Sequence, residues 1–237
     1  AERNCRAFES HKPLLDMVEA MVVVTPTRFH HAVAAEALDH GLPVFVEKPL
    51  ASTSTEAAEL EEAARRRGLP LQVGHIERFN PAYEALRRRL FRPRYIRAER
   101  SGPFTGRSLD IGAVLDLMIH DIDIVLCLVK SPVRRISASG VAVLSETADI
   151  ANARIEFDNG CVANLTSSRI SLKNMRKMRL FQRDAYIGID FLNKETEIVR
   201  LKGGDSEAGP SAALFRFPYS GSLCLCKHPA GKGNRNS

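Results

Sequence analysis

The chain has 237 residues, of which 44% are hydrophobic and 26% are charged. This composition is ordinary for a globular protein with a real core, and it excludes wholesale disorder. The longest central apolar run, Ile124–Val129, is far shorter than the roughly 20 residues that span a bilayer. No N-terminal segment resembles a signal peptide, so we expect a soluble, cytoplasmic protein with no membrane partner.

Five cysteines are spread over the chain, an odd number that does not suggest the disulfide framework of a small secreted domain. Cys224, Cys226 and His228 lie close together in the sequence. Tetrahedral zinc needs four ligands, usually in two separated pairs, and the sequence offers no second pair. We therefore expect no metal site.

The net charge of +6 and the pI of about 9.2 would suit a nucleic-acid partner. However, the arginine triplets at 65–67 and 87–89 follow helix-like stretches, where cations meet the partial negative charge of a helix C-terminus. The chain has no Trp, and its aromatic residues do not alternate with basic ones as they do on a base-stacking surface. The basic residues therefore indicate solvated helix ends, and we expect no nucleic-acid partner.

The first half of the chain alternates between short apolar runs and helix-like stretches. The runs are rich in β-branched residues and end near Pro or Gly, as buried strands do. Thr53 and Glu56 form a capping box at the start of the second helical stretch, and Gly68 ends it. Alternation of this kind predicts a parallel sheet with right-handed crossovers. The expected strands are 21–24, 44–46 and 71–73, and the expected helices are 28–40 and 53–67.

The carboxyl ends of such parallel strands are where the fold binds its ligand. Thr25, Glu47–Lys48 and Gly74–His75 follow the three strand ends, so we expect chemistry there. The usual dinucleotide fingerprint, G-x-G-x-x-G between a strand and a helix, is not in this chain. Gly203-Gly204 and Gly209 do not replace it, because they neither follow a strand nor open a helix.

The second half of the chain has a different pattern. We expect a strand at 94–99, a long and largely buried helix at 111–130, and then a series of β segments. The clearest segment is a hairpin, in which strands 151–157 and 161–168 flank Asp158-Asn159-Gly160. An Asn-Gly turn is favoured there because both central residues take positive φ. One long helix among many strands predicts an α+β domain with an antiparallel sheet.

We therefore expect an α/β protein in three parts. Residues 1–77 form an incomplete doubly wound (Rossmann) parallel sheet, and residues 78–202 form an α+β domain with an open antiparallel sheet. From Gly203 onward the sequence is rich in Gly, Pro and Ser and loses its periodicity. Residues 203–237 are therefore expected to be an irregular tail.

Two sets of residues are candidates for chemistry. Lys48 lies at a strand end before Pro49, which disfavours helical geometry at the lysine, and a lysine in a cleft can stabilise negative charge on a substrate oxygen. A surface lysine paired with a carboxylate explains its position equally well. Asp116, His120 and Asp123 have the i, i+4, i+7 spacing of one helix face, so that a carboxylate would orient the imidazole and support its protonated form. A buried, hydrogen-bonded histidine with a structural aspartate is the alternative.

Three segments make the sequence similar to a known family. They are "VVVTPTRFHHAVAAEALDHGLPVFVEKPLA", "VGHIERFNPAY" and "GAVLDLMIHDIDIVLCL". Together they closely resemble the Gfo/Idh/MocA family of NAD(P)-dependent oxidoreductases, from about Leu14 to about Lys202. The E-K-P triplet and the D-x-x-x-H helix are specific when they occur together in this order, whereas either alone is weak.

The resemblance implies a role for each matching residue. The E-K-P lysine would be the catalytic lysine near the nicotinamide, and the D-x-x-x-H pair would act as acid/base and assisting carboxylate. These residues are Lys48, His120 and Asp116. The T-P-x-x-x-H stretch, the E-K-P glutamate and the R-F-N stretch would lie near cofactor and substrate. They assign Thr25, Pro26, His30, Glu47 and Arg78 to cofactor binding and Asn80 to substrate binding.

Within the family, "GHIERFNPAY" and the segment 167–191 look most like nucleotide-sugar dehydrogenases, particularly the UDP-N-acetylglucosamine 3-dehydrogenase branch. A basic stretch that includes Arg169 could meet a substrate diphosphate, or it could be a solvated sheet edge guarded against aggregation. The resemblance implies hydride transfer between a sugar or nucleotide-sugar hydroxyl and NAD or NADP. It also implies a homo-oligomer, because the family's exposed sheets often serve for association.

Two features depart from the family pattern. The first βαβ unit, with its glycine-rich turn and acidic ribose-binding residue, is not in the sequence, and the closing segment does not look like a family ending. We expect an N-terminally truncated chain. The alternative function is therefore a catalytically inactive fragment that serves only as a binding or interaction module.

Overall fold

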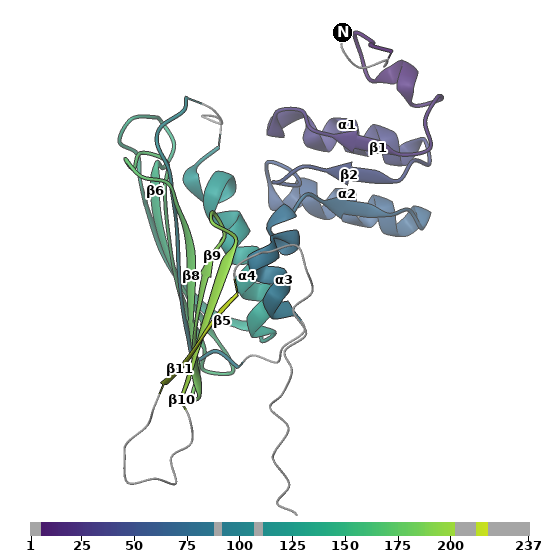
Figure 1. Ribbon diagram of the computed structural model, residues 1–237. Coiled ribbons are helices and arrows are strands. Elements are labelled where there is room, and N and C mark those ends of the chain that lie inside the picture. Colours follow the sequence, from purple (N-terminus) through teal and green to yellow (C-terminus); the bar gives the residue numbers. More distant parts are fainter. Residues whose placement is uncertain (1–5, 88–91, 107–110, 202–211, 218–237) are drawn as a thin grey trace, which may run out of the picture.

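The protein consists of two units (Figure 1), and each has its own hydrophobic core. The computed structural model describes residues 6–87, 92–106, 111–201 and 212–217. A small parallel sheet with two helices forms the first unit, and a large sheet with helices α3 and α4 against one face forms the second. Within the described ranges, no helix has the length and apolarity needed to cross a membrane.

The first unit confirms the expected parallel sheet. Its strands pair in the order β1-β2-β3, and all pairs are parallel. The side chains that point toward α1 and α2 form one apolar core, which includes Val23, Leu38, Val46 and Leu60. The elements are η1 (Lys12–Leu14), β1 (Met21–Val23), η2 (Thr27–Phe29), α1 (His30–Asp39), β2 (Val44–Val46), α2 (Ser54–Arg67) and β3 (Leu71–Val73).

The caps of α2 are those that the sequence predicts. The Glu56 N–H donates to the Thr53 hydroxyl at 3.2 Å, and the Thr53 N–H donates back to the Glu56 carboxylate at 3.1 Å. Gly68 ends the helix in the left-handed region with φ of 64°. Such caps depend only on neighbours in the sequence, so they can be predicted from it.

One expectation for β1 is wrong. The sequence suggested a buried strand, but Val22 and Val24 are 65% and 68% exposed, while Met21 and Val23 are buried. Successive side chains of a strand point to opposite faces, and α1 and α2 cover only one face. In the described part of the chain, no element covers the other face of this sheet at Val22 and Val24.

The second unit contains an eight-stranded sheet in the order β11-β10-β9-β8-β4-β7-β6-β5. All neighbours are antiparallel except β4 and β7, which run parallel, so the sheet is mixed rather than purely antiparallel. The parallel pair arises because the chain crosses over through α4 between the two strands. The strands are β4 (Tyr95–Ser101), β5 (Val133–Val141), β6 (Ile150–Phe157), β7 (Val162–Ser168), β8 (Met175–Phe181), β9 (Ala185–Asp190), β10 (Glu195–Leu201) and β11 (Ala212–Phe217).

Three helical segments lie against this sheet or lead to it. They are η3 (Ile76–Phe79), α3 (Pro81–Arg87) and the long segment that was expected at 111–130. That long segment differs from a plain α-helix, because it begins with a π-helical turn, η4 (Val114–Met118), and continues as α4 (Ile119–Val129). The Ile119 N–H donates to the Val114 carbonyl five residues earlier, which is the π-helical pattern.

The predicted hairpin is present as β6 and β7, but its turn differs in detail. Gly160 has φ of 81°, whereas Asn159 is not among the residues with positive φ. The Gly160 N–H donates to the Phe157 carbonyl at 3.0 Å, and Phe157 also pairs with Cys161. The connection has the three residues that the predicted strand bounds left between them, but only one of them, Gly160, is left-handed, whereas two positive φ values were expected.

Part of the expected tail is regular. Residues 203–237 were expected to be irregular, but 212–217 form β11, which pairs with β10 from Ala212 to Phe217. The composition of the whole tail concealed this short segment, whose backbone finds a partner at the edge of the sheet. Cys224, Cys226 and His228 lie outside the described residues. Within those residues, no cluster of three or more His, Cys, Asp or Glu could hold a metal ion.

Candidate functional site

The three carboxyl ends of the small parallel sheet meet at one edge, as expected. The backbone ladder continues past the strands, since Glu47 N–H donates to the Val23 carbonyl at 2.9 Å and Gly74 N–H donates to the Val46 carbonyl at 2.8 Å. Gly74 allows the close approach. A Cβ atom on it would lie 2.8 Å from the Glu47 carboxylate and 3.2 Å from the Glu47 Cα atom.

Lys48 extends from this edge to the second unit. Its ammonium donates to the backbone carbonyl oxygen of Asp116 at 2.6 Å and to the Asp116 carboxylate at 3.2 Å. The two side chains are only 19% and 23% exposed. The structure therefore brings together two of the three residues to which the resemblance gives a catalytic role, from positions 68 residues apart.

Asp116, which holds Lys48, lies within the π-turn. A π-turn inserts one residue into a helix and changes the hydrogen-bonding pattern of its backbone carbonyls. Here the Asp116 carbonyl accepts the Lys48 ammonium. Spacing along an ideal α-helix is therefore not the geometry of this segment, although Asp116, His120 and Asp123 all lie near the boundary between the units.

His120 lies in an environment that opposes its protonated form. Burial, and after it the positive charges of Arg100 and Lys48, lower its pKa to about 3. Its Nδ1 atom is buried without a hydrogen-bond partner in the described structure. The expectation that Asp116 would pair with His120 and support the imidazolium is wrong for this structure, because Asp116 is paired with Lys48 instead.

His75 is a residue of the site that was expected only as one that follows a strand end, without an assigned role. It follows β3 at the same edge as Lys48, and its charge influences His120. Burial is the main cause that lowers the pKa of His75, and its Nδ1 atom is buried without a hydrogen-bond partner. Its position after a strand end was the available sequence signal, but no motif singled it out.

Arg78, in the segment that leads into the second unit, forms an ion pair with Asp123 of α4. The Arg78 Nε–H donates to the Asp123 carboxylate at 2.8 Å, and this pairing raises the pKa of Arg78. Asp123 is buried, whereas Arg78 is 45% exposed. The same carboxylate lies 3.9 Å from the Nδ1 atom of His75, which is too far for a hydrogen bond.

A buried charge cluster lies close to this site. Arg100, which is 3% exposed, donates to Glu77 at 2.9 Å and to Asp121 at 2.9 Å. It thereby connects η3, β4 and α4. Sequence reasoning did not identify the cluster, because its members are far apart in the chain. Removing one partner of such a cluster leaves a buried charge unpaired, which commonly costs about 3–5 kcal/mol.

The other expected site residues fall into two groups. Thr25 and Pro26 are exposed at the end of β1, where a ligand can reach them. His30 is buried, and its two ring nitrogens each lie 2.7 Å from a backbone carbonyl, of Pro49 and Thr25. Asn80 donates to Glu77 and to the Phe191 carbonyl and accepts from the Ala82 N–H.

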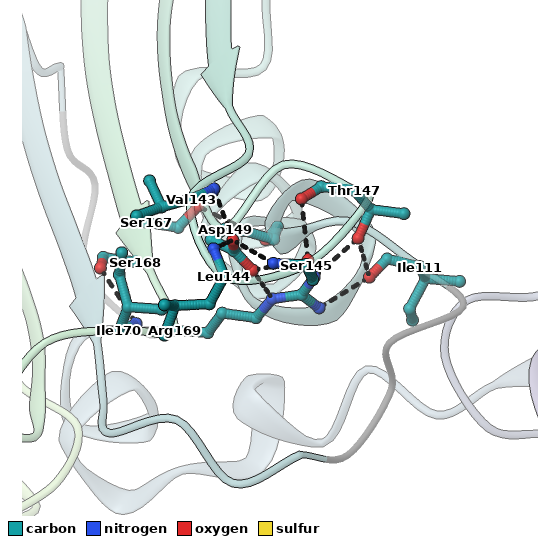
Figure 2. A network of polar contacts seen from close by, with 11 residues as sticks. Ile111, Val143, Leu144, Ser145, Thr147, Asp149, Ser167, Ser168, Arg169 and Ile170 are labelled. Atoms are coloured by element: carbon teal, nitrogen blue, oxygen red, sulfur yellow. Dashed lines mark hydrogen bonds and ion pairs between the residues drawn. The ribbon is translucent and has the colours of Figure 1, made fainter.

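Arg169, expected to bind substrate, also directs its guanidinium to partners within the chain (Figure 2). His30, Asn80 and Arg169 thus have structural hydrogen bonds in this chain. Their roles toward a cofactor or substrate stay predictions.

The strand-end residues fit one part of a dinucleotide. Glu47 is a half-buried carboxylate at the end of the central strand, beside the exposed Thr25-Pro26 segment and the Lys48 ammonium. A carboxylate at such an edge can accept hydrogen bonds from ribose hydroxyls. The glycine-rich turn that would hold the pyrophosphate is not among these residues.

Comparisons with known proteins agree with this architecture. Residues 1–75 match a family model described as an oxidoreductase family with an NAD-binding Rossmann fold, and residues 85–186 match the GFO/IDH/MocA C-terminal domain. UDP-N-acetylglucosamine 3-dehydrogenase of Acidithiobacillus ferrooxidans is 44% identical over 205 residues, which are 86% of this chain and 66% of that protein. The NAD(+)-dependent scyllo-inositol 2-dehydrogenase of Bacillus subtilis is 29% identical over 65% of this chain and 49% of its own length.

Solved structures show the same fold. The Acidithiobacillus ferrooxidans enzyme superposes with a TM-score of 0.83 and 41% identity, over 90% of this chain and 68% of that chain. Levoglucosan dehydrogenase, in complex with NADH and levoglucosan, has a TM-score of 0.77 at 18% identity, over 89% of this chain and 64% of its own.

The chain spans less than two thirds of the length of the curated relatives described above. Even so, both of its units match the family's models, and an incomplete Rossmann sheet followed by a large open sheet is the arrangement that the sequence predicted. The chain therefore belongs to the Gfo/Idh/MocA family of oxidoreductases.

Proposed function

We propose that the protein represented by this chain oxidises a hydroxyl group of a nucleotide sugar and transfers the hydride to NAD. The observation that carries the proposal is the contact between Lys48 and Asp116, which joins the NAD-binding unit to the helix that carries His120. The 44% identity to UDP-N-acetylglucosamine 3-dehydrogenase supports UDP-N-acetylglucosamine as the substrate to test first.

In the proposed reaction His120 is the proton acceptor. A pKa of about 3 keeps the imidazole neutral at pH 7, which is the form that can take a proton from a sugar hydroxyl. Because Nδ1 is buried, Nε2 is the ring nitrogen that would accept the proton. The carbon–hydrogen electron pair leaves as hydride, and the hydroxyl carbon becomes a ketone.

Lys48 compensates for the weakness of this base. Its ammonium can donate a hydrogen bond to the substrate oxygen and stabilise the negative charge that develops there. Asp116 would hold the ammonium in place through its carboxylate and carbonyl oxygens. Thr25, Pro26 and Glu47 would hold the cofactor near Lys48, and nicotinamide, when bound, supplies the hydride acceptor.

The test is an assay of the complete protein with UDP-N-acetylglucosamine and NAD⁺, in which the formation of NADH is measured by its absorbance. We expect substrate-dependent NADH formation, and Lys48→Met should abolish it while the protein stays folded. Lys12→Met is the matched control, because Lys12 is exposed in η1 and should keep full activity. Full activity of Lys48→Met would contradict the assignment.

A cofactor titration separates this proposal from the inactive-fragment alternative. Saturable enhancement of NADH fluorescence by the 237-residue chain is expected if the strand-end residues bind cofactor. Its absence, together with an active complete protein, would mean that this chain alone is only a fragment of the binding site. NADPH in parallel tests the choice between NAD and NADP.

We also propose that the protein is a homo-oligomer. The large sheet has α3 and α4 on one face, and its other face presents half-exposed and exposed side chains such as Arg97, Arg154 and Phe181. Light scattering coupled to size-exclusion chromatography gives the mass of the complete protein. A monomer at micromolar concentration would overturn the proposal.

A further inference from the structure

A buried ion pair connects the residue that precedes β6 with the residue that follows β7. Asp149 precedes β6 and has no exposed surface, and Arg169 follows β7 and is 6% exposed. Figure 2 shows both residues inside a network of loop and strand-end groups. The Arg169 Nε–H donates to the Asp149 carboxylate at 2.8 Å.

The Asp149 carboxylate fixes the loop that precedes it. Its Oδ2 atom accepts the backbone N–H groups of Val143, Leu144 and Ser145 at 2.8, 2.7 and 3.0 Å. Its Oδ1 atom accepts the Ser145 hydroxyl at 2.8 Å in addition to Arg169. Burial by itself would raise the pKa of Asp149, but these hydrogen bonds favour the charged form and together hold the pKa well below its usual range.

The other two guanidinium nitrogens of Arg169 extend the network toward the catalytic helix. Nη1 donates to the backbone carbonyl of Ile111 at 2.9 Å. Nη2 donates to the hydroxyl oxygens of Ser145 at 2.7 Å and Thr147 at 2.6 Å. The Thr147 hydroxyl in turn donates to the same Ile111 carbonyl at 3.4 Å. Arg169 therefore ties the loop 143–149 to the residue that precedes Gly112.

Two further contacts hold the following residues. The Ala113 N–H donates to the Ala148 carbonyl at 2.8 Å, and the Ser167 hydroxyl donates to the Ala113 carbonyl at 3.4 Å. The Asp116 N–H then donates to the Gly112 carbonyl at 3.0 Å. The segment 111–113 is thus held from the loop and from β7, immediately before the π-turn that presents Asp116 to Lys48.

We propose that Arg169, together with Asp149 and Thr147, is a positioning device for the catalytic helix. It fixes the segment 111–113 and thereby sets the distance between Asp116 and Lys48. The inference rests on the proposed function and replaces the expected role of Arg169 at a substrate diphosphate. Arg169 acts through Ile111 and Asp116, so it is a positioning residue rather than a catalytic one.

The test uses variants that weaken the network without leaving a buried charge unpaired. Arg169→Lys keeps the positive charge beside Asp149 but cannot reach Asp149, Ile111 and Thr147 together, because a lysine lacks the planar fork. Thr147→Val removes one hydroxyl and keeps both charges. Arg154→Lys is the matched control, since Arg154 is a half-exposed arginine of the same sheet that pairs with Glu156 on β6.

We expect faster hydrogen exchange in the 111–118 peptide of Arg169→Lys, with β6 and β7 unchanged, and a smaller acceleration in Thr147→Val. With the complete protein, kcat should fall about tenfold to a hundredfold in Arg169→Lys, because misplacement of reacting groups by about 1 Å has this effect. The KM for the nucleotide sugar should stay near the unaltered value, and the pH profile of kcat should shift. Arg154→Lys should match the unaltered protein throughout.

Other results would overturn the inference. A large rise in the KM for the nucleotide sugar with unchanged kcat would return Arg169 to substrate binding. Unchanged exchange in the 111–118 peptide of both Arg169→Lys and Thr147→Val would show that the network does not fix this segment. The exchange experiment needs no turnover, so an unaltered protein that fails to oxidise nucleotide sugars contradicts only the proposed function.

Discussion

The Lys48 ammonium lies 2.6 Å from the backbone carbonyl oxygen of Asp116 and 3.2 Å from its carboxylate. A charge held by both a carbonyl and a carboxylate has a fixed position and direction, which a flexible lysine would not have on its own. The same charge also acts on His120, whose pKa it helps to lower. In the proposed function Lys48 would therefore have two effects, one on the substrate oxygen and one on the pKa of His120.

The second effect gives a prediction for Lys48→Met. Removal of the positive charge should raise the pKa of His120, because Lys48 is one of the cations that oppose the imidazolium. The measurement is an NMR titration of the histidine Cε1–H signals, with His120 assigned by its absence from His120→Gln. Lys12→Met should leave the His120 titration unchanged. An equal His120 pKa in Lys48→Met and the unaltered protein would contradict the electrostatic coupling.

The pKa of His75 provides a second, independent test of the electrostatics of the site. Arg78 lowers the pKa of His75, whereas Asp123 raises it from 3.9 Å away. Arg78→Gln removes the opposing charge and releases the Asp123 carboxylate, so the pKa of His75 should rise. Asp123→Asn removes the favourable charge, so the pKa of His75 should fall further. Two shifts of the same sign in the NMR titration would show that the ion pair does not control His75.

The parts of the fold that the sequence predicts are those determined by neighbouring residues. The capping box of Thr53 and Glu56, the left-handed Gly68 and the three parallel strands follow from local patterns. The parallel pairing of β4 with β7 and the strand β11 depend on which distant segments become neighbours. No local pattern contains that information.

In the candidate site, too, the features set by neighbouring residues could be predicted and those set by distant residues could not. The strand-end rule and the family resemblance indicate Lys48 correctly as a residue at the edge of the small sheet. The expected Asp116–His120 pair fails because a π-turn and a lysine from the other unit change the partner of Asp116. The charge of Arg169 did not reveal that its side chain is buried and hydrogen-bonded within the chain, and its role toward a substrate stays a prediction.

Stability should decrease as the pH falls from 6.5 toward 5. His120 has a folded-state pKa of about 3, so the unfolded chain binds a proton in this range and the folded protein does not. One such group contributes a slope of at most about 1.4 kcal/mol per pH unit. Urea unfolding at pH 5.0, 5.75 and 6.5 measures the slope, which should be smaller in His120→Gln. Equal slopes would mean that His120 titrates normally in the folded protein.

Two glycine substitutions should separate local strain from damage to the site. Gly68→Ala places a Cβ in open space at φ of 64°, so it should cost about 1 kcal/mol of stability and leave NADH binding unchanged. Gly74→Ala places a Cβ 2.8 Å from the Glu47 carboxylate and 3.2 Å from its backbone. That contact should cost about 1–3 kcal/mol and displace Glu47.

The expected result is a loss of NADH affinity in Gly74→Ala alone, measured by fluorescence titration beside urea unfolding of both variants. Unchanged affinity in a destabilised Gly74→Ala would mean that the close packing of the two strand ends serves the fold and that Glu47 does not contact the cofactor. Equal losses of affinity in both variants would mean that binding simply follows stability. Only a difference between the two supports the placement of the cofactor beside Glu47 and Lys48.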